Sequence, residues 1–358
     1  GYRGEYIYDI ARDMIARDGD RYVRMPFEEA LPAFKTFACQ RILQEIREDL
    51  ERFNVVFDNW FSEQQLYDTQ AVQAVVERLL AEGILYKQDG AVWFKSSGGE
   101  DEKDRVVIRS DGRPTYFASD IAYHENKFQR GFEKVVNVWG ADHHGYVPRM
   151  KGVIKALGYP EDALQVILVQ MVSLLRGGER VAMSTRAGEF IPLADVVNEV
   201  GVDATRFFFT MRRSDSQLDF DLDLAKSQSK ENPVYYVQYA HARICSIFRE
   251  AEAQGIILPD DVRTIDCSPL AQEEEHVLIA ELAQFPNIIE ISARALEPHR
   301  LTYYVHNVAA IFHAYYNKTR VITEDLKVTQ ARLLLVTGVQ IVLKNALTLL
   351  GVSAPERM

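Results

Sequence analysis

Three short segments of the sequence carry side chains that could bind a charged substrate. The first is Trp139–Gly145 (WGADHHG), which directly follows an apolar run. Glycine lets a ligand approach the backbone closely, and one Asp and two His residues supply donors and acceptors at a predicted strand end. A metal site is the weaker interpretation, because adjacent side chains rarely point at one ion and no other ligand cluster completes a tetrahedron. A tight turn with exposed polar side chains is the structural alternative.

The second segment, Arg180–Glu189 (RVAMSTRAGE), combines small, hydroxyl and basic residues. Ser184 and Thr185 could donate hydrogen bonds to phosphate oxygens, and Arg186 could neutralise phosphate charge. Composition alone favours an ordinary surface loop. The P-loop pattern GxxxxGK[ST] and the dinucleotide pattern GxGxxG are both absent, so neither of those nucleotide folds is predicted.

The third segment is Thr115–Asp120 (TYFASD). If the chain turns helical after Thr115, Tyr116 and Asp120 share one helix face at i,i+4. A carboxylate can then form a two-point ion pair with a guanidinium while the aromatic ring packs on the planar cation. A packed Tyr beside a solvated Asp has at least equal weight on these residues alone.

Strand and helix patterns alternate in the first half of the chain. The apolar spacing predicts helices at 34–53, 72–80 and 150–157, and strands at 90–94, 134–139 and within 164–175. Residues 106–108 and 115–117 flank Asp111-Gly112, which predicts a hairpin. Strand–helix–strand alternation implies a parallel sheet with ligands at the C-terminal strand ends.

The second half reads as helices alone. They are predicted at 233–253, 270–295, 298–317 and 329–350, with a loop at 254–269 and a stop at Gly351. His299, His306 and His313 recur every seven residues. Sequential sites lie two turns apart, about 10 Å, which is too far for one metal ion. A polar helix face is therefore preferred to a metal stripe.

Composition limits the class of protein further. The 358 residues have a net charge of −11 and suggest two or three domains. No run of about 18 apolar residues predicts a membrane span. Three scattered cysteines favour free thiols in a reducing cytoplasm. Residues 294–358 contain eight Lys/Arg and four Asp/Glu, which gives this segment a net charge of +4. Such a charge is compatible with a polyanion partner or with an ordinary solvated helix face.

The order and spacing of these motifs resemble arginyl-tRNA synthetases of class I. Residues 181–188 are similar to the family's version of the class signature KMSKS, and Gly140–Tyr146 to its strand-end segment. The later matches are Tyr235–Arg243 at the start of the anticodon-binding helices, Glu297–Leu301, Phe312–Asn317 and the C-terminal Gly351–Met358.

The resemblance implies a fold and an activity. The expected fold is a partial class I, Rossmann-like α/β nucleotide-binding domain at 1–222, incomplete at its N-terminus and with an insertion at about 60–114, followed by an all-α helical-bundle anticodon-binding domain at 223–358. The activity is ATP-dependent activation of L-arginine and its transfer to tRNA(Arg). ATP is then a substrate that brings Mg²⁺, no metal is tightly bound, and a cytoplasmic monomer is expected.

The resemblance also assigns residues. It implies arginine binding by Tyr116, Asp120 and His144, and ATP binding by Gly140, Asp142 and His143. The catalytic loop over the pyrophosphate contains Met183, Ser184, Thr185 and Arg186. The tRNA contacts are Tyr239, Tyr315, Tyr316 and Met358, where aromatic faces stack on unpaired bases.

Two departures from the family pattern matter. The HxGH signature is absent; in the family it precedes the Tyr2–Tyr6 region, so it would lie before residue 1, and the 358 residues alone are expected not to form arginyl-adenylate. Ala182 and Thr185 stand where the signature has lysines, so Arg180, Arg186 or a Lys elsewhere would supply the cation. The alternatives are another class I synthetase, such as the cysteinyl enzyme with its zinc-binding cysteines, and a noncatalytic RNA-binding protein.

Overall fold

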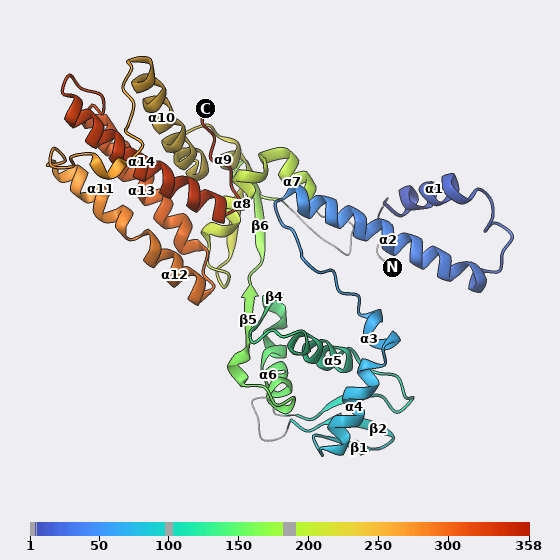
Figure 1. Cartoon of the computed structure of the whole chain (residues 1–358). Coiled ribbons are helices and arrows are strands. Elements are labelled where there is room, and N and C mark those ends of the chain that lie inside the picture. The colour runs from blue at the N-terminus through green and yellow to red at the C-terminus, as the bar shows by residue number, and fades with distance from the viewer. Residues whose placement is uncertain (1–3, 5, 97–102, 182–190) are drawn as a thin grey trace. The chain divides into compact units, whose positions relative to one another are not determined.

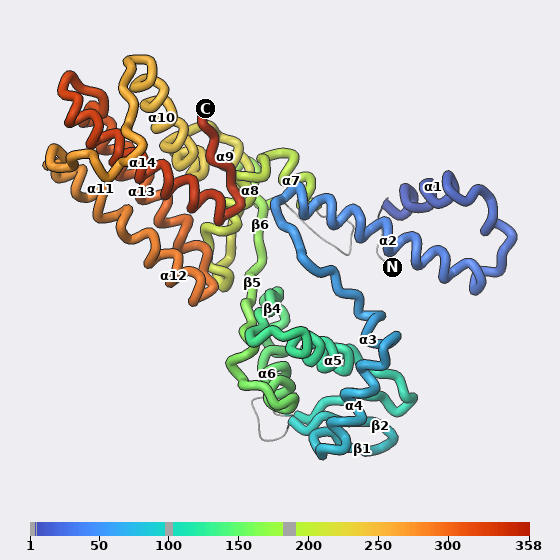
Figure 2. Tube along the Cα trace, viewed as in Figure 1, coloured from blue at the N-terminus to red at the C-terminus, as the bar shows by residue number. Residues whose placement is uncertain are grey.

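The chain folds into two compact units, which are described separately. The structure is a computed structural model that describes residues 4, 6–96, 103–181 and 191–358. The first unit combines Gly1–Val56, Val172–Arg213 and Leu218–Met358, and the second combines Phe57–Met171 with Ser214–Gln217. Figures 1 and 2 trace the path of the chain through both units.

The second unit begins with two helices and a small antiparallel sheet. Strands β1 to β3 pair in sequence order, and the fully buried Leu79 and Val107 belong to the core of this unit. The bounds are α3 Gln64–Asp68, α4 Ala71–Ala81, β1 Leu85–Gln88, β2 Ala91–Phe94 and β3 Arg105–Ile108.

A parallel strand pair forms the other part of this unit. Strands β4 and β5 pair from Val135 with Leu164 to Gly140 with Val169. Val135 and Asn137 are buried on one face of β4, whereas Val136 and Val138 on the other face are exposed, and the strand predicted at 134–139 is present. The bounds are α5 Tyr116–Gln129, β4 Val135–Gly140, the 3-10 helix η1 Ala141–Tyr146, α6 Val147–Ala156, η2 Glu161–Ala163 and β5 Leu164–Val169.

The hairpin predicted at 106–117 is wrong in its second strand. Thr115 is extended and directly precedes α5, Tyr116 and Phe117 start that helix, and β3 pairs with β2, while Ile108 forms only an isolated antiparallel bridge with Pro114 across the turn. The Thr115 side chain explains the change, because its hydroxyl donates to the carbonyl oxygens of Val106 and Val107 at 2.9 and 3.0 Å. This link ends the turn and starts a helix.

The first unit contains two long N-terminal helices and a short mixed sheet. Strand β6 lies between β7 and β8, antiparallel to the first and parallel to the second. The strand predicted within 164–175 is present as β5, and the same range also contains the start of β6, which belongs to the other unit. The bounds are α1 Tyr6–Asp18, α2 Phe27–Arg52, β6 Val172–Arg176, β7 Glu179–Arg180, α7 Leu193–Val200, α8 Val202–Met211, β8 Leu218–Asp221 and α9 Leu222–Lys226.

The remainder of the first unit is a helical bundle, as the sequence predicts, with its helices packed side by side (Figure 1). The single helix expected at 270–295 is two helices, because Pro286 cannot donate a backbone hydrogen bond and α12 starts afresh after Gln284. The bounds are α10 Pro233–Ala253, η3 Val262–Thr264, α11 Glu273–Ala283, α12 Phe285–Ala295, α13 His299–Lys318 and α14 Leu326–Leu349.

Helix α14 is the apolar centre of this bundle. Its length and composition would suit a membrane span, with a mean hydropathy of 1.4 over the best window, but half of that window is buried inside the unit. A core helix passes the same test. Val336, Val339 and Leu343 are fully buried and pack within the main core cluster, which accounts for the apolar composition without a membrane.

Candidate functional site

The start of α5 places Tyr116 and Asp120 as the sequence predicts. Thr115 is extended at φ −88° and ψ 167°, and the helix begins directly after it. Tyr116 is 82% exposed at the first position of the helix. Asp120 lies one turn later and is partly buried, while Phe117 and Ile121 turn into the core. The aromatic ring and the carboxylate therefore occupy successive turns at the edge of the unit.

Asp120 has an unusual environment for a carboxylate. The Tyr146 hydroxyl donates a hydrogen bond of 2.5 Å to its Oδ2 atom. Among the described residues, Oδ1 accepts no hydrogen bond, and no Lys or Arg lies within ion-pair distance. Burial raises the pKa of Asp120 above its ordinary value, and the Tyr146 hydrogen bond opposes that rise. The site thus holds a carboxylate with one oxygen uncommitted.

Two buried polar side chains, His124 and Asn137, and the partly buried Lys127 support α5 behind Asp120. His124 Nδ1 lies 2.8 Å from the Asp120 carbonyl oxygen, so this nitrogen carries the proton. The Asn137 amide nitrogen lies 2.8 Å from His124 Nε2 and donates to it, while the Asn137 Oδ1 accepts from Lys127 Nζ at 2.9 Å. Burial lowers the pKa of His124 to about 4 and that of Lys127 to about 8. The histidine is therefore neutral.

The strand-end segment forms η1 immediately after β4. Asp142, His143 and His144 are all exposed there. A Cβ at Gly140 would lie 2.5 Å from an Asp142 carboxylate oxygen, so a larger residue at position 140 would displace the exposed Asp142 side chain. His143 and Asp142 approach to 3.7 Å, and His144 Nδ1 lies 3.3 Å from the Ala141 carbonyl. The turn presents these side chains outward, where a ligand can reach them.

The KMSKS-like loop lies outside the described residues. Met183, Ser184, Thr185 and Arg186 belong to it, and so does Ala182. Its first flank is described: the backbone of Val181 donates to Leu174, which continues the β6–β7 pairing. Arg180, one of the candidate cations, forms an exposed ion pair of 3.2 Å with Asp219.

A cluster of aromatic and basic side chains lies between α10 and α13 in the other unit. The Arg243 guanidinium lies 4.6 Å from the ring centre of Tyr239 and 4.9 Å from that of Tyr316. Arg243 also donates to the Tyr239 hydroxyl at 3.1 Å and lies 3.1 Å from His313 Nδ1. Tyr235 stacks on Tyr239 with ring centres 6.1 Å apart. This cluster offers aromatic faces beside a fixed positive charge.

The two tyrosines predicted to contact RNA differ sharply. Tyr315 is fully buried, and its hydroxyl donates to Glu275 at 3.3 Å. It cannot reach a base without unfolding the bundle, so the predicted tRNA contact of Tyr315 is not compatible with its position. Tyr316, the next residue, is partly exposed against Arg243.

The C-terminal segment is tied to α8 and α10. The Ser353 backbone donates to Asp203 at 3.0 Å, and His241 Nδ1 donates to the Pro355 carbonyl at 2.9 Å. Arg249 reaches the Glu356 carbonyl at 3.3 Å. Met358 is 50% exposed at the end of this held segment. The terminal side chain is thereby displayed on the surface of the bundle unit.

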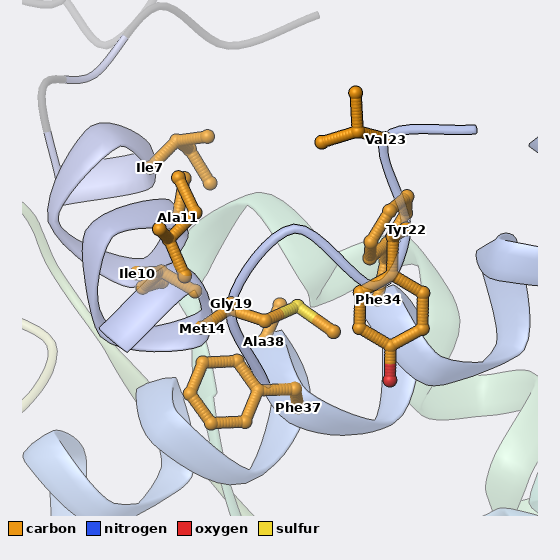
Figure 3. A pocket seen from close by; sticks show the side chains of 11 residues that line it. Ile7, Ile10, Ala11, Met14, Gly19, Tyr22, Val23, Phe34, Phe37 and Ala38 are labelled. Atoms are coloured by element: carbon orange, nitrogen blue, oxygen red, sulfur yellow. The ribbon is translucent and has the colours of Figure 1, made fainter. Parts of the chain in front are cut away.

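An apolar pocket between α1 and α2 is a weaker candidate. It has a volume of about 420 Å³. Figure 3 shows Met14 and Phe37 on facing helices, with Phe34 and Tyr22 at the other end. No residue of the predicted sites lines it. A pocket with almost no polar lining would not fix a charged substrate.

Metal-ligand groups are sparse. The described ranges contain no group of three His, Cys, Asp or Glu side chains that could hold a metal ion. His306 and His313 instead pack against the Tyr236 ring at 5.2 and 4.6 Å.

Several site residues were not predicted from sequence. Tyr146 is the last residue of the strand-end motif and is 26 positions from Asp120 in the sequence. No helical or strand spacing therefore predicts their hydrogen bond. Lys127 and Asn137 meet only because α5 packs beside β4. Arg243 could have been predicted, since it follows Tyr239 at i,i+4 on a predicted helix.

Two parts of the chain match known protein families. Residues 11–219 match the family described as tRNA synthetases class I (R), catalytic domain, and residues 237–358 match the DALR anticodon binding domain. A class I synthetase catalytic domain followed by a helical anticodon-binding domain is therefore the fold class of the chain.

Individual relatives agree with that class. The whole chain is 56% identical over 357 residues to an arginine–tRNA ligase of Syntrophotalea carbinolica and 55% identical over 358 residues to one of a Geobacter species. It spans 64% of the length of each. A solved Campylobacter jejuni structure assigned to the arginyl-tRNA synthetases superposes with a TM-score of 0.90 at 38% identity, over all of this chain and 76% of that one. The chain belongs to the class I arginyl-tRNA synthetase family.

Proposed function

We propose that this chain provides the arginine site, part of the ATP site and the anticodon-binding surface of an arginyl-tRNA synthetase. The reaction would activate L-arginine with ATP and transfer it to tRNA(Arg). Family membership supports the assignment. The catalytic part would extend to about residue 222 and the anticodon-binding part would begin at 223, with an insertion at about 60–114. A cytoplasmic monomer is the proposed state.

The observation that carries this proposal is the carboxylate of Asp120. It is partly buried, it receives only the Tyr146 hydroxyl, and no described cation pairs with it. A guanidinium would satisfy Oδ1 with a charge-assisted hydrogen bond and would offset the cost of burying the charge. Tyr116, exposed one turn earlier, would cover the planar cation. His144 would contact the same substrate from η1.

ATP would bind at the end of β4. Gly140 lets a nucleotide approach the backbone, and Asp142 and His143 would line the adenylate pocket from η1. Met183, Ser184, Thr185 and Arg186 would lie over the pyrophosphate. Mg²⁺ would enter on the ATP phosphates, because it prefers phosphate oxygens and water to a complete protein cage. Catalysis would depend on positioning and charge stabilisation without a protein nucleophile.

The anticodon loop would bind the aromatic cluster between α10 and α13. Tyr239 and Tyr316 would stack on unpaired bases, and Arg243 would hold both rings in place. Met358 would close the site from the held C-terminal segment. Tyr315 is omitted from this surface because its side chain is buried.

Asp120→Asn tests the arginine site. The amide keeps the size of the side chain, but it removes the charge and can turn a donor toward the guanidinium. We expect arginine affinity to fall by roughly 2–5 kcal/mol while ATP affinity changes little. Asp142→Asn is the matched control: the same chemical change at η1 should weaken ATP more than arginine. Titration calorimetry of each variant with each ligand gives the comparison.

Activity assays separate the enzyme from the alternatives. The 358 residues contain no HxGH motif. We therefore expect ATP–pyrophosphate exchange only from a protein in which an HxGH-containing segment precedes these residues. In that protein, Asp120→Asn should abolish arginine-dependent exchange. Equal arginine affinity in Asp120→Asn and the unchanged chain would remove Asp120 from the site and favour a noncatalytic RNA-binding role.

A further inference from the structure

We propose that Tyr146 is a positioning residue that makes the Asp120 site select a guanidinium over its neutral isostere, the urea group of L-citrulline. The inference rests on the proposed function, in which Asp120 contacts the substrate side chain. It assigns a specificity role to a residue that does not itself need to touch the substrate.

The geometry gives Tyr146 a single task at Asp120. Its hydroxyl donates to Oδ2, which fixes the rotation of the carboxylate and leaves Oδ1 for the substrate. A phenol that donates needs an acceptor, and an ionised carboxylate has two acceptor oxygens. A protonated Asp120 would instead carry a donor hydrogen on one oxygen. The hydrogen bond therefore favours the charged form at the substrate oxygen.

The groups that face Asp120 do not replace this hydrogen bond. Burial raises the pKa of Asp120, the Tyr146 hydrogen bond lowers it, Glu63 before α3 raises it through charge, and Lys127 on α5 lowers it. His124 on α5 approaches the Asp120 backbone carbonyl and is neutral above its pKa of about 4. Tyr146 is thus the strongest of the influences that keep Asp120 ionised.

Neither nearby cation is aimed at the carboxylate. Lys127 Nζ donates to the Asn137 amide oxygen and lies 4.3 Å from the Tyr123 ring centre. Arg149 on α6 lies 4.7 Å from the Tyr146 ring centre, where its charge opposes the rise in the pKa of Tyr146 that burial causes, and no ion pair between Arg149 and Asp120 is found among the described residues. An ionised Asp120 therefore meets the substrate directly.

The ionisation state of the Asp120 carboxylate determines whether the site prefers L-arginine to L-citrulline. A guanidinium brings donors and a positive charge to Oδ1. Citrulline has a carbonyl oxygen where arginine has an NH₂ group, and that oxygen repels a carboxylate but accepts from a carboxylic acid. If Asp120 gains a proton, its carboxylic acid can donate to the citrulline oxygen, so citrulline is rejected less strongly. The same proton removes the negative charge that attracts the guanidinium, so arginine binds more weakly and the ratio of the two affinities falls. A site that hydrogen-bonds its correct substrate rejects an incorrect ligand because the buried polar groups of the site then lack a hydrogen-bond partner.

The ring of Tyr146 is held independently of its hydroxyl. It packs against Trp139 at 5.8 Å and Phe117 at 6.3 Å between ring centres, beside the Arg149 guanidinium. Tyr146→Phe should therefore keep the fold and remove one oxygen atom. Tyr123→Phe is the matched control, because it makes the same change on α5 in a ring that contacts Lys127 and not Asp120.

The test is titration calorimetry of the whole chain with L-arginine and with L-citrulline from pH 5 to 8. In Tyr146→Phe we expect the ratio of the two affinities to fall about tenfold and the loss of arginine binding on acidification to begin at a higher pH. Tyr123→Phe should keep both the ratio and the pH profile. Carboxyl ¹³C shifts of Asp120 without ligand should show the same upward displacement of its pKa in Tyr146→Phe.

Two results would overturn the inference in distinguishable ways. An unchanged ratio, pH profile and Asp120 titration in Tyr146→Phe would reject the role of Tyr146 and leave Asp120 as the arginine ligand. If the unchanged chain binds arginine no better than Asp120→Asn does, the proposed function fails, and this inference fails with it.

Discussion

Two acidic side chains, one in each unit, show how differently a carboxylate can be used. Glu275 in the bundle is fully buried and pairs with Arg332 at 2.8 Å. Its other oxygen accepts the Gln272 backbone N–H at 3.0 Å, in a capping box that starts α11. Asp120 in the other unit is partly buried and pairs with no described cation.

The two carboxylates differ in the groups that pair with them. The bundle satisfies Glu275 from its own chain, and Arg332 also donates to the Arg320 carbonyl at 2.8 Å. This network joins α11, α14 and the segment after α13. Around Asp120 the described chain provides the Tyr146 hydroxyl and a neutral histidine but no paired cation, and in the proposed function a ligand supplies that charge. A complete polar network stabilises one fold, whereas an incomplete one is suited to binding.

The largest expected effect is in the bundle. Arg332→Ala should lower the free energy of unfolding of the bundle unit by about 3–5 kcal/mol, because Glu275 would remain buried without its cation. Urea unfolding followed by amide exchange of α11 and α14 measures it. The control is Lys318→Ala, which breaks an exposed pair with Glu274 and should cost less than about 1 kcal/mol. Equal losses in both variants would show that Glu275 does not depend on Arg332 for its burial, and would contradict the structural role given to this pair.

The unit that contains Asp120 should be the more sensitive to acid. Its His124 has a pKa lowered from 6.5 to about 4 by burial, so the unfolded chain binds a proton that the folded chain does not. Stability is therefore retained above pH 6.5 and lost as the pH falls toward 4, by roughly 2–3 kcal/mol. Amide exchange of α5 at pH 7 and pH 5 should detect this loss.

His124→Gln is the control for the acid effect. Glutamine keeps an acceptor and donors near Asn137 but does not titrate. Its α5 should show a smaller difference between pH 7 and pH 5 than the unchanged chain. If both proteins lose α5 protection equally, acid sensitivity arises elsewhere in the unit.

A smaller effect is expected at the neighbouring tyrosines of α13. Tyr316→Ala should weaken binding of a tRNA with a matched anticodon by about 1–3 kcal/mol and reduce discrimination against a change in the middle anticodon base. Tyr315→Phe should leave tRNA binding unchanged, because that side chain is buried. Lys318→Ala should weaken all tRNAs alike, since a phosphate contact carries no sequence information. Filter binding at several salt concentrations makes the comparison.

Local patterns predicted most of the helices. The apolar stripes at 72–80, 150–157 and 233–253 lie on α4, α6 and α10, because one helix face must be buried in each. The hairpin at 106–117 is reduced to a turn with one antiparallel bridge, between Ile108 and Pro114, because the chain becomes helical after Thr115. The segment 164–175 contains the predicted strand, β5, and also the start of β6, and the two strands pair with different partners, β4 and β8.

The candidate site was predictable only where its residues are close in sequence. Tyr116 and Asp120 follow from a helical spacing of four. The Tyr146 hydrogen bond depends on how η1 packs beside α5, which no spacing encodes. The helical period predicts that Tyr315 and Tyr316 point apart, but the choice of Tyr315 as the buried one depends on the contact with Glu275 from α11.

A crystal structure of the chain with bound L-arginine tests the central claim most directly. The account predicts guanidinium nitrogens about 2.7–2.9 Å from Asp120, with Oδ1 as the acceptor and the Tyr146 hydroxyl still on Oδ2. It also predicts that the Tyr116 ring covers the guanidinium plane. Arginine bound with its guanidinium away from Asp120, or a Tyr146 hydroxyl that leaves the carboxylate, would contradict the account.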